Sequence, residues 1–157
     1  MKAEELMIGD LVRVSKDVSI KKGTIVEIRA IDADREFHEM KGCATCVPVD
    51  NPDGLSGGVW LDYLEPIPLT SEIIAKNFEK KALYGIFDDF FNFTIREYND
   101  GMYILNYHCC EFDMPDTQVV GICYVHELQH FFTAHGIEKE IEVNSVVRTT
   151  ENTNINN

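Results

Sequence analysis

The amino-acid sequence predicts an α+β protein in two parts, a small β-barrel over residues 1–66 and an antiparallel sheet with two helices over residues 67–148. Three observations predict this class. Short alternating runs with turn signals recur about every ten residues before Pro66, as in small barrels. Pro66 and Pro68 then enforce an extended connector. Finally, helical and alternating segments follow one another up to a polar tail, 149–157, which is predicted to be disordered.

The predicted strands of the first part lie between strong turn signals. In the first strand, alternation places Leu11 on the opposite face from Val12 and Val14. A second alternating run covers 24–31, and a short closing strand covers 58–61. The turn signals are Gly9-Asp10, Lys22-Gly23, Pro52-Asp53-Gly54 and Gly57-Gly58.

The second part begins with a short helix, predicted over 71–80, which Thr70 or Ser71 can cap. Alternating apolar residues then predict strands over 87–97 and 102–112, joined at an Asn99-Asp100-Gly101 hairpin signal. Further extended segments are expected at 118–122 and 141–147. Both helices are expected on one face of this sheet.

The last helix is predicted over residues 124–136, with Gly136 as the residue that ends it. Its apolar stripe consists of Tyr124, Val125, Leu128, Phe131 and Phe132. His126 and His130 fall on the opposite side, and we expect them to face solvent or a cleft.

His126-Glu127-Leu128-Gln129-His130 fits the H-E-x-x-H pattern, in which two histidines bind zinc and the glutamate acts as general base. A catalytic zinc site needs a third protein ligand. The nearest histidine, His135, is one residue out of the register in which a third ligand follows this pattern. We therefore interpret the match as coincidental and expect no catalytic residue, metal or cofactor. The alternative is a zinc hydrolase with Glu127 as the base and His126 and His130 as ligands.

The composition of the chain limits the classes of partner that it is expected to bind. The net charge is −13, and both halves of the chain are acidic, without a basic stripe that could bind a phosphate backbone. Nucleic acid and anionic membrane surfaces are thus disfavoured as partners. The start of the chain lacks the apolar core of a signal peptide, and no apolar run reaches the length of a membrane span, so a cytoplasmic location is expected.

The five cysteines are expected to be reduced thiols. Cys43 and Cys46 form a C-x-x-C pair, to which His108, Cys109 and Cys110 would have to add ligands for a structural zinc site. A second C-x-x-C is missing, so buried or loop thiols are the simpler interpretation.

Phe37, Trp60 and Tyr63 are the candidate partner-binding residues, because aromatic side chains can line a groove that binds a peptide. The simpler interpretation is that they fill a small core. Together with the charge, they favour a non-enzymatic interaction module that binds a protein. A structural component that associates with itself is a further alternative.

Two resemblances add to this interpretation. The order G-D-x-V-x-V (9–14) and K-G-x-x-x-x-I (22–28) resembles SH3-like barrels of the KOW or Tudor kind. The segments 6–12, 64–70 and 124–141 resemble an uncharacterised family of small proteins from Bacteroidales genomes and their phages or mobile elements. That family's last motif reads V-H-x-L-Q, commonly with glutamine at x. The resemblance therefore implies that Glu127 and His130 need not act together.

Overall fold

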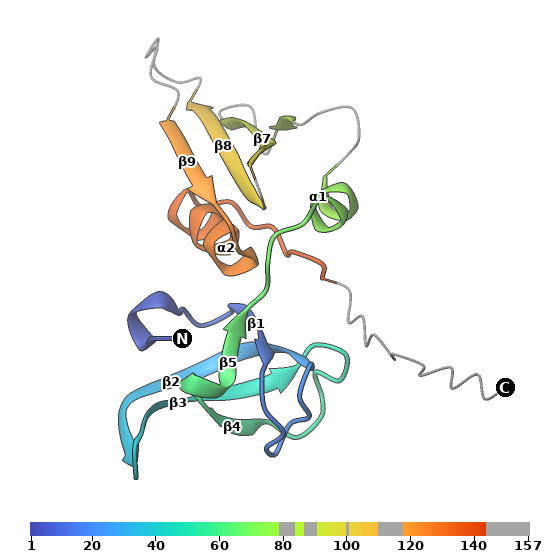
Figure 1. The fold of residues 1–157 in the computed structure, drawn as a ribbon. Helices are drawn as coiled ribbons and strands as arrows, with labels where there is room; N and C mark the ends of the chain where they lie inside the picture. The colour runs from blue at the N-terminus through green and yellow to red at the C-terminus, as the bar shows by residue number, and fades with distance from the viewer. Residues whose placement is uncertain (79–83, 87–90, 100, 110–117, 144–157) are drawn as a thin grey trace, which may run out of the picture.

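The computed structural model describes residues 1–78, 84–86, 91–99, 101–109 and 118–143 (Figure 1). The first part contains η1 (Ala3–Glu5), β1 (Leu11–Val14), β2 (Ile25–Phe37), β3 (Met40–Pro48), β4 (Gly57–Trp60), η2 (Leu61–Tyr63) and β5 (Leu64–Pro66). The second part contains α1 (Ser71–Asn77), β6 (Tyr84–Ile86), β7 (Phe91–Asn99), β8 (Met102–Cys109), β9 (Gln118–Ile122) and α2 (Val125–Ala134).

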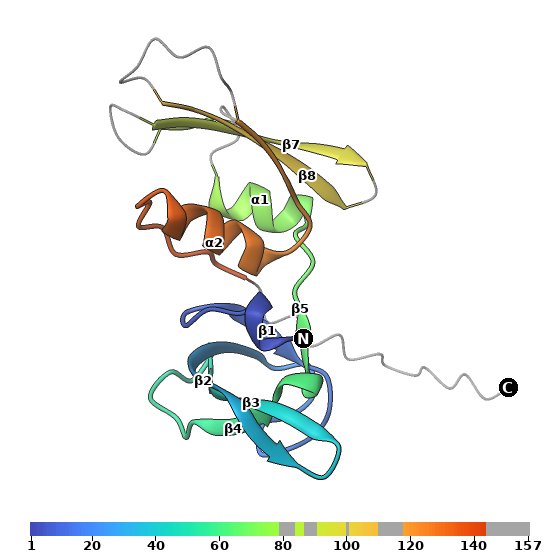
Figure 2. The same ribbon diagram turned by 90° about the vertical axis from the view of Figure 1, so that its left-hand side faces the viewer.

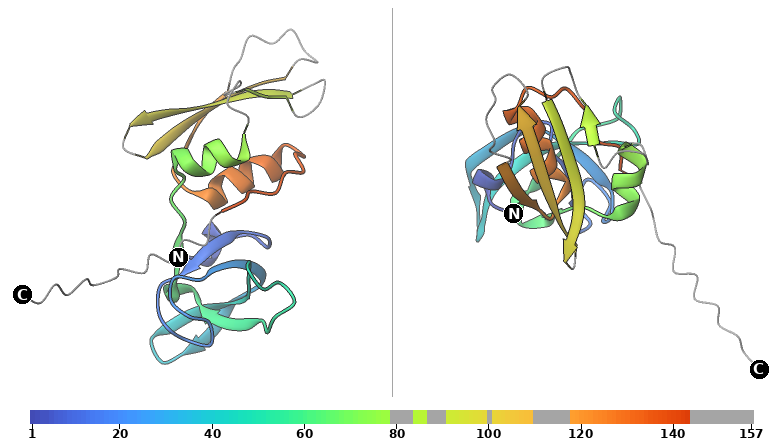
Figure 3. Two further views of the ribbon diagram at one scale, coloured as in Figure 1. Left: turned by 90° about the vertical axis from the view of Figure 1, so that its right-hand side faces the viewer. Right: turned by 90° about the horizontal axis from the view of Figure 1, so that it is seen from above.

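The protein has two antiparallel sheets with both helices between them, which confirms the α+β class (Figures 2 and 3). The first sheet has the order β4-β3-β2-β1-β5, and the second has the order β6-β7-β8-β9. Within the described residues, no pairing of β4 with β5 closes the first sheet into a barrel. What the structure establishes for the first part is therefore a five-stranded antiparallel sheet.

β1 contributes to two hydrophobic cores because successive side chains of a strand point to opposite faces. Val12 and Val14 are fully buried in the core of the first part, together with Val26 and Ile28. Leu11 instead joins the core that surrounds α2. The predicted alternation of these residues is confirmed, and both faces of the strand are covered.

The connector between the two parts is extended, as Pro66 and Pro68 predict, and it is also buried. Ile67 and Leu69 are each 2% exposed. The amide of Leu69 donates to the carbonyl of Cys123, and the amide of Val125 donates to that of Ile67, at 2.8 and 2.9 Å. The connector thus runs antiparallel to the chain that enters α2, and it joins the layers through backbone hydrogen bonds.

The second sheet confirms the predicted hairpin, since Asn99 pairs with Met102 across the turn. Tyr103 and Leu105 are buried on one face of β8, as their alternation predicts. The sheet also includes β6, which the sequence did not predict. The segments 87–90 and 110–117 lie outside the described residues, as does the tail 149–157.

The short helix α1 ends at Asn77, earlier than predicted, while its cap is as expected: the Thr70 hydroxyl accepts a hydrogen bond from the amide of Ile73 at 3.3 Å. Asn77 also holds the last described segment. Its side-chain amide donates to the carbonyl of Glu142 and accepts from the amide of the same residue, at 2.8 and 2.7 Å. Residues 141–143 form no strand, in contrast to the strand expected over 141–147, of which 144–147 lie outside the described residues.

No helix in the described part of the chain is long and apolar enough to cross a membrane.

Two leucines should differ strongly in their contribution to the free energy of unfolding. Leu128 is fully buried, whereas Leu55 is 94% exposed. We expect Leu128→Ala to lower the free energy of unfolding by about 2–5 kcal/mol, because it leaves a cavity between the layers. Leu55→Ala should change it by less than about 0.5 kcal/mol. Urea denaturation of both variants checks this, and equal effects would contradict the placement of α2.

Candidate functional site

The H-E-x-x-H segment forms the first turns of α2, where Glu127 acts as a cap. Its carboxylate accepts hydrogen bonds from the backbone amides of Cys123 and Tyr124, at 2.7 and 3.0 Å. These amides precede the helix and have no partner within it. The acidic group also lies at the positive end of the helix dipole. The candidate general base is therefore engaged in capping the start of the helix.

His130 is bound to a carboxylate from the turn that leads into β1. Its Nε2 lies 2.9 Å from both carboxylate oxygens of Asp10. Asp10 is only 2% exposed and also accepts a hydrogen bond from the amide of Met7 at 2.7 Å. The contact joins residues that are 120 positions apart in the chain.

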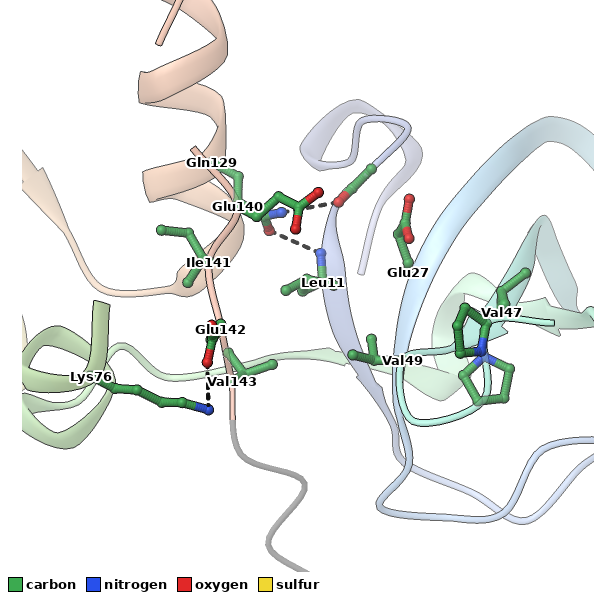
Figure 4. A pocket seen from close by; sticks show the side chains of 13 residues that line it. Leu11, Glu27, Val47, Val49, Lys76, Gln129, Glu140, Ile141, Glu142 and Val143 are labelled. Atoms are coloured by element: carbon green, nitrogen blue, oxygen red, sulfur yellow. Dashed lines mark hydrogen bonds and ion pairs between the residues drawn. The ribbon is translucent and has the colours of Figure 1, made fainter. Parts of the chain in front are cut away.

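Gln129, which lies between the two candidate ligands in the sequence, makes the second contact with the start of β1. Its side-chain oxygen accepts from the amide of Leu11 at 2.9 Å, and its side-chain nitrogen donates to the carbonyl of Gly9 at 3.0 Å (Figure 4). The carboxamide therefore satisfies one backbone donor and one backbone acceptor at the start of β1. Because both groups are partly buried, each would otherwise be costly to leave unpaired.

The prediction that the histidine pair faces solvent or a cleft is wrong for His126, which is 6% exposed. The neighbouring residues Gln129 and His130 contact the start of β1 and are partly buried. The ring of His126 stacks on that of Tyr124, with centroids 5.8 Å apart, and meets the His130 ring edge to face at 5.6 Å. Its Nδ1 is buried and has no hydrogen-bond partner in the described part of the chain.

Burial is the main influence on the protonation of His126. It lowers the pKa of the imidazole from the ordinary value of 6.5, because the charged form loses its hydration. The carboxylates of Asp10, Glu127 and Glu5 act in the opposite direction, and His130 acts in the same direction as burial. The folded protein therefore favours neutral His126.

These residues form a cluster that joins α2 to the start of β1. No group of three or more His, Cys, Asp and Glu side chains suited to a metal ion occurs within the described ranges. Two of the would-be zinc residues have other contacts, since Glu127 caps the helix and His130 binds Asp10.

The C-x-x-C pair lies on a strand. Cys43 and Cys46 are both buried on β3. Cys46 belongs to the core of the first part, and burial, followed by the nearby Cys43, raises its pKa to about 12. Such a thiol stays protonated and is a poor nucleophile at neutral pH. The side chains of His108 and Cys109 and the whole of Cys110 lie outside what is described.

The structure brings together two of the three candidate partner-binding residues. Phe37 is 57% exposed, and its ring stacks on that of Trp60 with centroids 6.4 Å apart. The guanidinium of Arg35 lies 5.8 Å from the Trp60 ring centroid. Tyr63 packs partly against the core of the first part, and the ammonium of Lys16 lies 4.5 Å from its ring centroid. Within the described residues no ring contact joins Tyr63 to the other two.

Sequence reasoning did not identify Asp10 and Gln129 as site residues. Asp10 was assigned only to a turn, and Gln129 was one of the variable positions of the H-E-x-x-H pattern. The signal that could have drawn attention to them is the short Gly9-Asp10-Leu11 segment, in which a turn leads directly into a buried strand.

No protein-family model, curated protein or solved structure matches this chain.

The contacts of Gln129 predict a specific loss of stability. Gln129→Glu keeps the acceptor for Leu11 but loses the donor for the Gly9 carbonyl, and we expect a loss of about 1–3 kcal/mol. Thr133→Ala, at an exposed position on the same helix, is the control and should stay within about 0.5 kcal/mol. Thermal unfolding of both variants measures this loss. Equal stability of Gln129→Glu and Thr133→Ala would contradict the docking contact.

The lowered pKa of His126 predicts the direction of the pH dependence. Below about pH 6.5 the unfolded chain takes up a proton on this histidine, whereas the folded chain takes it up only at lower pH. Stability should therefore decrease as the pH falls from 6.5 toward the folded pKa. His126→Phe should flatten this part of the curve and the exposed His38→Gln should not, when urea midpoints are compared between pH 7 and pH 5. Parallel curves for wild type and His126→Phe would refute it.

Proposed function

We propose that this protein is a non-enzymatic interaction module that binds a protein partner. The observation that carries the proposal is the exposed stack of Phe37 on Trp60. We call residues 32–41, the outer part of the β2 and β3 hairpin, the hairpin arm. β1 pairs with β2 only between Ile25 and Glu27, so the arm extends past its neighbour in the sheet (Figure 1).

The arm has the composition of a recognition surface. Residues 32–39 are all exposed, and Phe37 at their end presents a large apolar ring to solvent. Aromatic side chains are enriched among the residues that dominate binding energy at protein interfaces. Burying this ring against a partner would supply a hydrophobic anchor at little cost in side-chain entropy.

Charge supports a basic partner surface. The arm carries four acidic residues, Asp32, Asp34, Glu36 and Glu39, against the basic residues Arg35 and Lys41. The chain as a whole has a net charge of −13. An acidic surface attracts basic patches over about a Debye length and repels nucleic acid. We include a cytoplasmic location in this proposal.

The proposal extends to the fold type of the first part and to the family of the chain. We propose that the five-stranded sheet is SH3-like, supported by its order, in which β1 pairs with both β2 and β5 and η2 leads directly into β5. We also propose membership of the Bacteroidales and phage-type family. Its V-H-x-L-Q motif would then be a docking motif, since Gln129 binds β1.

A zinc hydrolase is the second candidate, and one observation favours it. The Nδ1 of His126 is buried without a partner among the described residues, as an imidazole nitrogen awaiting a metal would be. Zinc binding would require His130 to leave Asp10, and catalysis would require Glu127 to leave the helix terminus.

Affinity capture with matched variants tests the interaction module. Wild-type protein and Leu55→Ala should retain the same basic protein from a lysate of the source cells. Phe37→Ala should retain it at least about 10-fold less, because truncating an interface anchor costs about 2 kcal/mol or more. The captured protein is then purified and titrated against all three. Equal affinities for wild type and Phe37→Ala would refute the arm as the binding surface.

Metal content decides between the two candidate functions. We expect protein purified without chelator to contain no zinc, and the His130→Asn variant to behave in the same way in elemental analysis. About one zinc per chain that is lost in His130→Asn would instead favour the hydrolase. Zinc retained in His130→Asn would indicate the cysteines.

A further inference from the structure

A cleft of about 390 Å³ lies between the first sheet and the last described segment, residues 137–143 (Figure 4). Its lining comes from β1, β2, β3, α1 and α2 as well as from that segment. The cleft is thus formed by both parts of the protein. Its volume lies in the range of sites that bind small ligands or single side chains.

The walls of the cleft are largely apolar. They include Leu11, Val47, Val49, Ile141 and Val143. Val49 is 41% exposed, so part of this surface is open to solvent. Covering it would be favourable by the usual free energy of removing apolar area from water.

The polar lining is acidic. Three carboxylates line the cleft, those of Glu27, Glu140 and Glu142, against the single ammonium of Lys76. Lys76 is 3.1 Å from Glu142, and Arg29 is 2.9 Å from Glu27. Glu140 has no ion-pair partner within the described residues. An additional cation at the cleft would be attracted by this carboxylate.

The cleft is held in shape before any ligand arrives. Both polar atoms of the Gln129 side chain are bound to the backbone of β1, and Asn77 fixes the backbone of Glu142 from the other side. Little conformational freedom has to be lost on binding, which favours affinity.

We infer that this cleft binds a lysine or arginine side chain of the partner protein, in a segment with apolar neighbours. The aliphatic stem would lie along Leu11, Val49 and Ile141, and the cationic end would reach Glu140 and Glu27. Long basic side chains bury their methylene groups in this way while the charge stays at a polar rim. The inference rests on the proposed function and adds a second contact to it, distinct from the hairpin arm.

Nuclear magnetic resonance titration of the full chain, labelled with ¹⁵N, tests this. The probe is the peptide acetyl-Val-Lys-Val-amide, and the control peptide has norleucine, which keeps the stem and lacks the charge. We expect the lysine peptide to shift the amide signals of Leu11, Val49 and Ile141, and the norleucine peptide to shift them much less. Glu140→Gln should weaken binding about 3-fold or more, as expected for the loss of one exposed ion pair. Glu138→Gln, exposed on the same segment and outside the cleft lining, should not.

Three results would overturn the inference: no shift at these amides, equal shifts with both peptides, or equal weakening by the two glutamine variants. Spermidine that competes for the same amides with higher affinity would indicate a free polyamine as ligand and would also overturn it. Phe37→Ala should leave the peptide titration unchanged. Failure of the titration with Phe37-dependent partner capture intact would refute the cleft alone, and the reverse result would refute the arm.

Discussion

The attachment of α2 to the start of β1 is the interaction on which the arrangement of the layers depends. Gln129 supplies one acceptor and one donor to backbone groups of Leu11 and Gly9, and His130 binds the buried carboxylate of Asp10. The Gln129 side chain thus satisfies one backbone donor and one backbone acceptor at the start of β1. A shift of α2 along the strand would break both hydrogen bonds. The helix is therefore held on the first sheet in a single register.

The same contacts give an ordinary structural role to four of the five residues in the metalloprotease-like pattern. Glu127 caps the helix, Leu128 fills the core, and Gln129 and His130 dock it. Each of these four side chains has one structural role, and α2 is buried on more than one of its sides. A pattern of five residues specifies spacing along a helix but carries no information about what lies opposite each side chain.

Local patterns in the sequence predicted the elements that depend on neighbouring residues. The alternation in β1, the Thr70 cap and the hairpin joining β7 and β8 are of this kind. The burial of His126 could not be predicted, because it accompanies the docking of α2 on the start of β1, more than 100 residues earlier in the chain. A polar side on a helix predicts exposure to solvent, whereas α2 lies between two sheets and has exposed positions only near its end, at Thr133 and Ala134. The end of α1 and the segment 137–143 depend likewise on Asn77 meeting Glu142.

The attachment of α2 also determines which parts of the first sheet remain available. It covers the face of β1 that carries Leu11 and leaves the two ends of β2 free for different uses. Near its start, Glu27 borders the cleft formed with the last described segment, while at its end Phe37 stands on the hairpin arm. A partner that contacted both the cleft and the hairpin arm would extend along most of β2. If the cleft binds the proposed partner, the docking contacts serve that binding indirectly, because α2 and the segment behind it form part of the cleft lining.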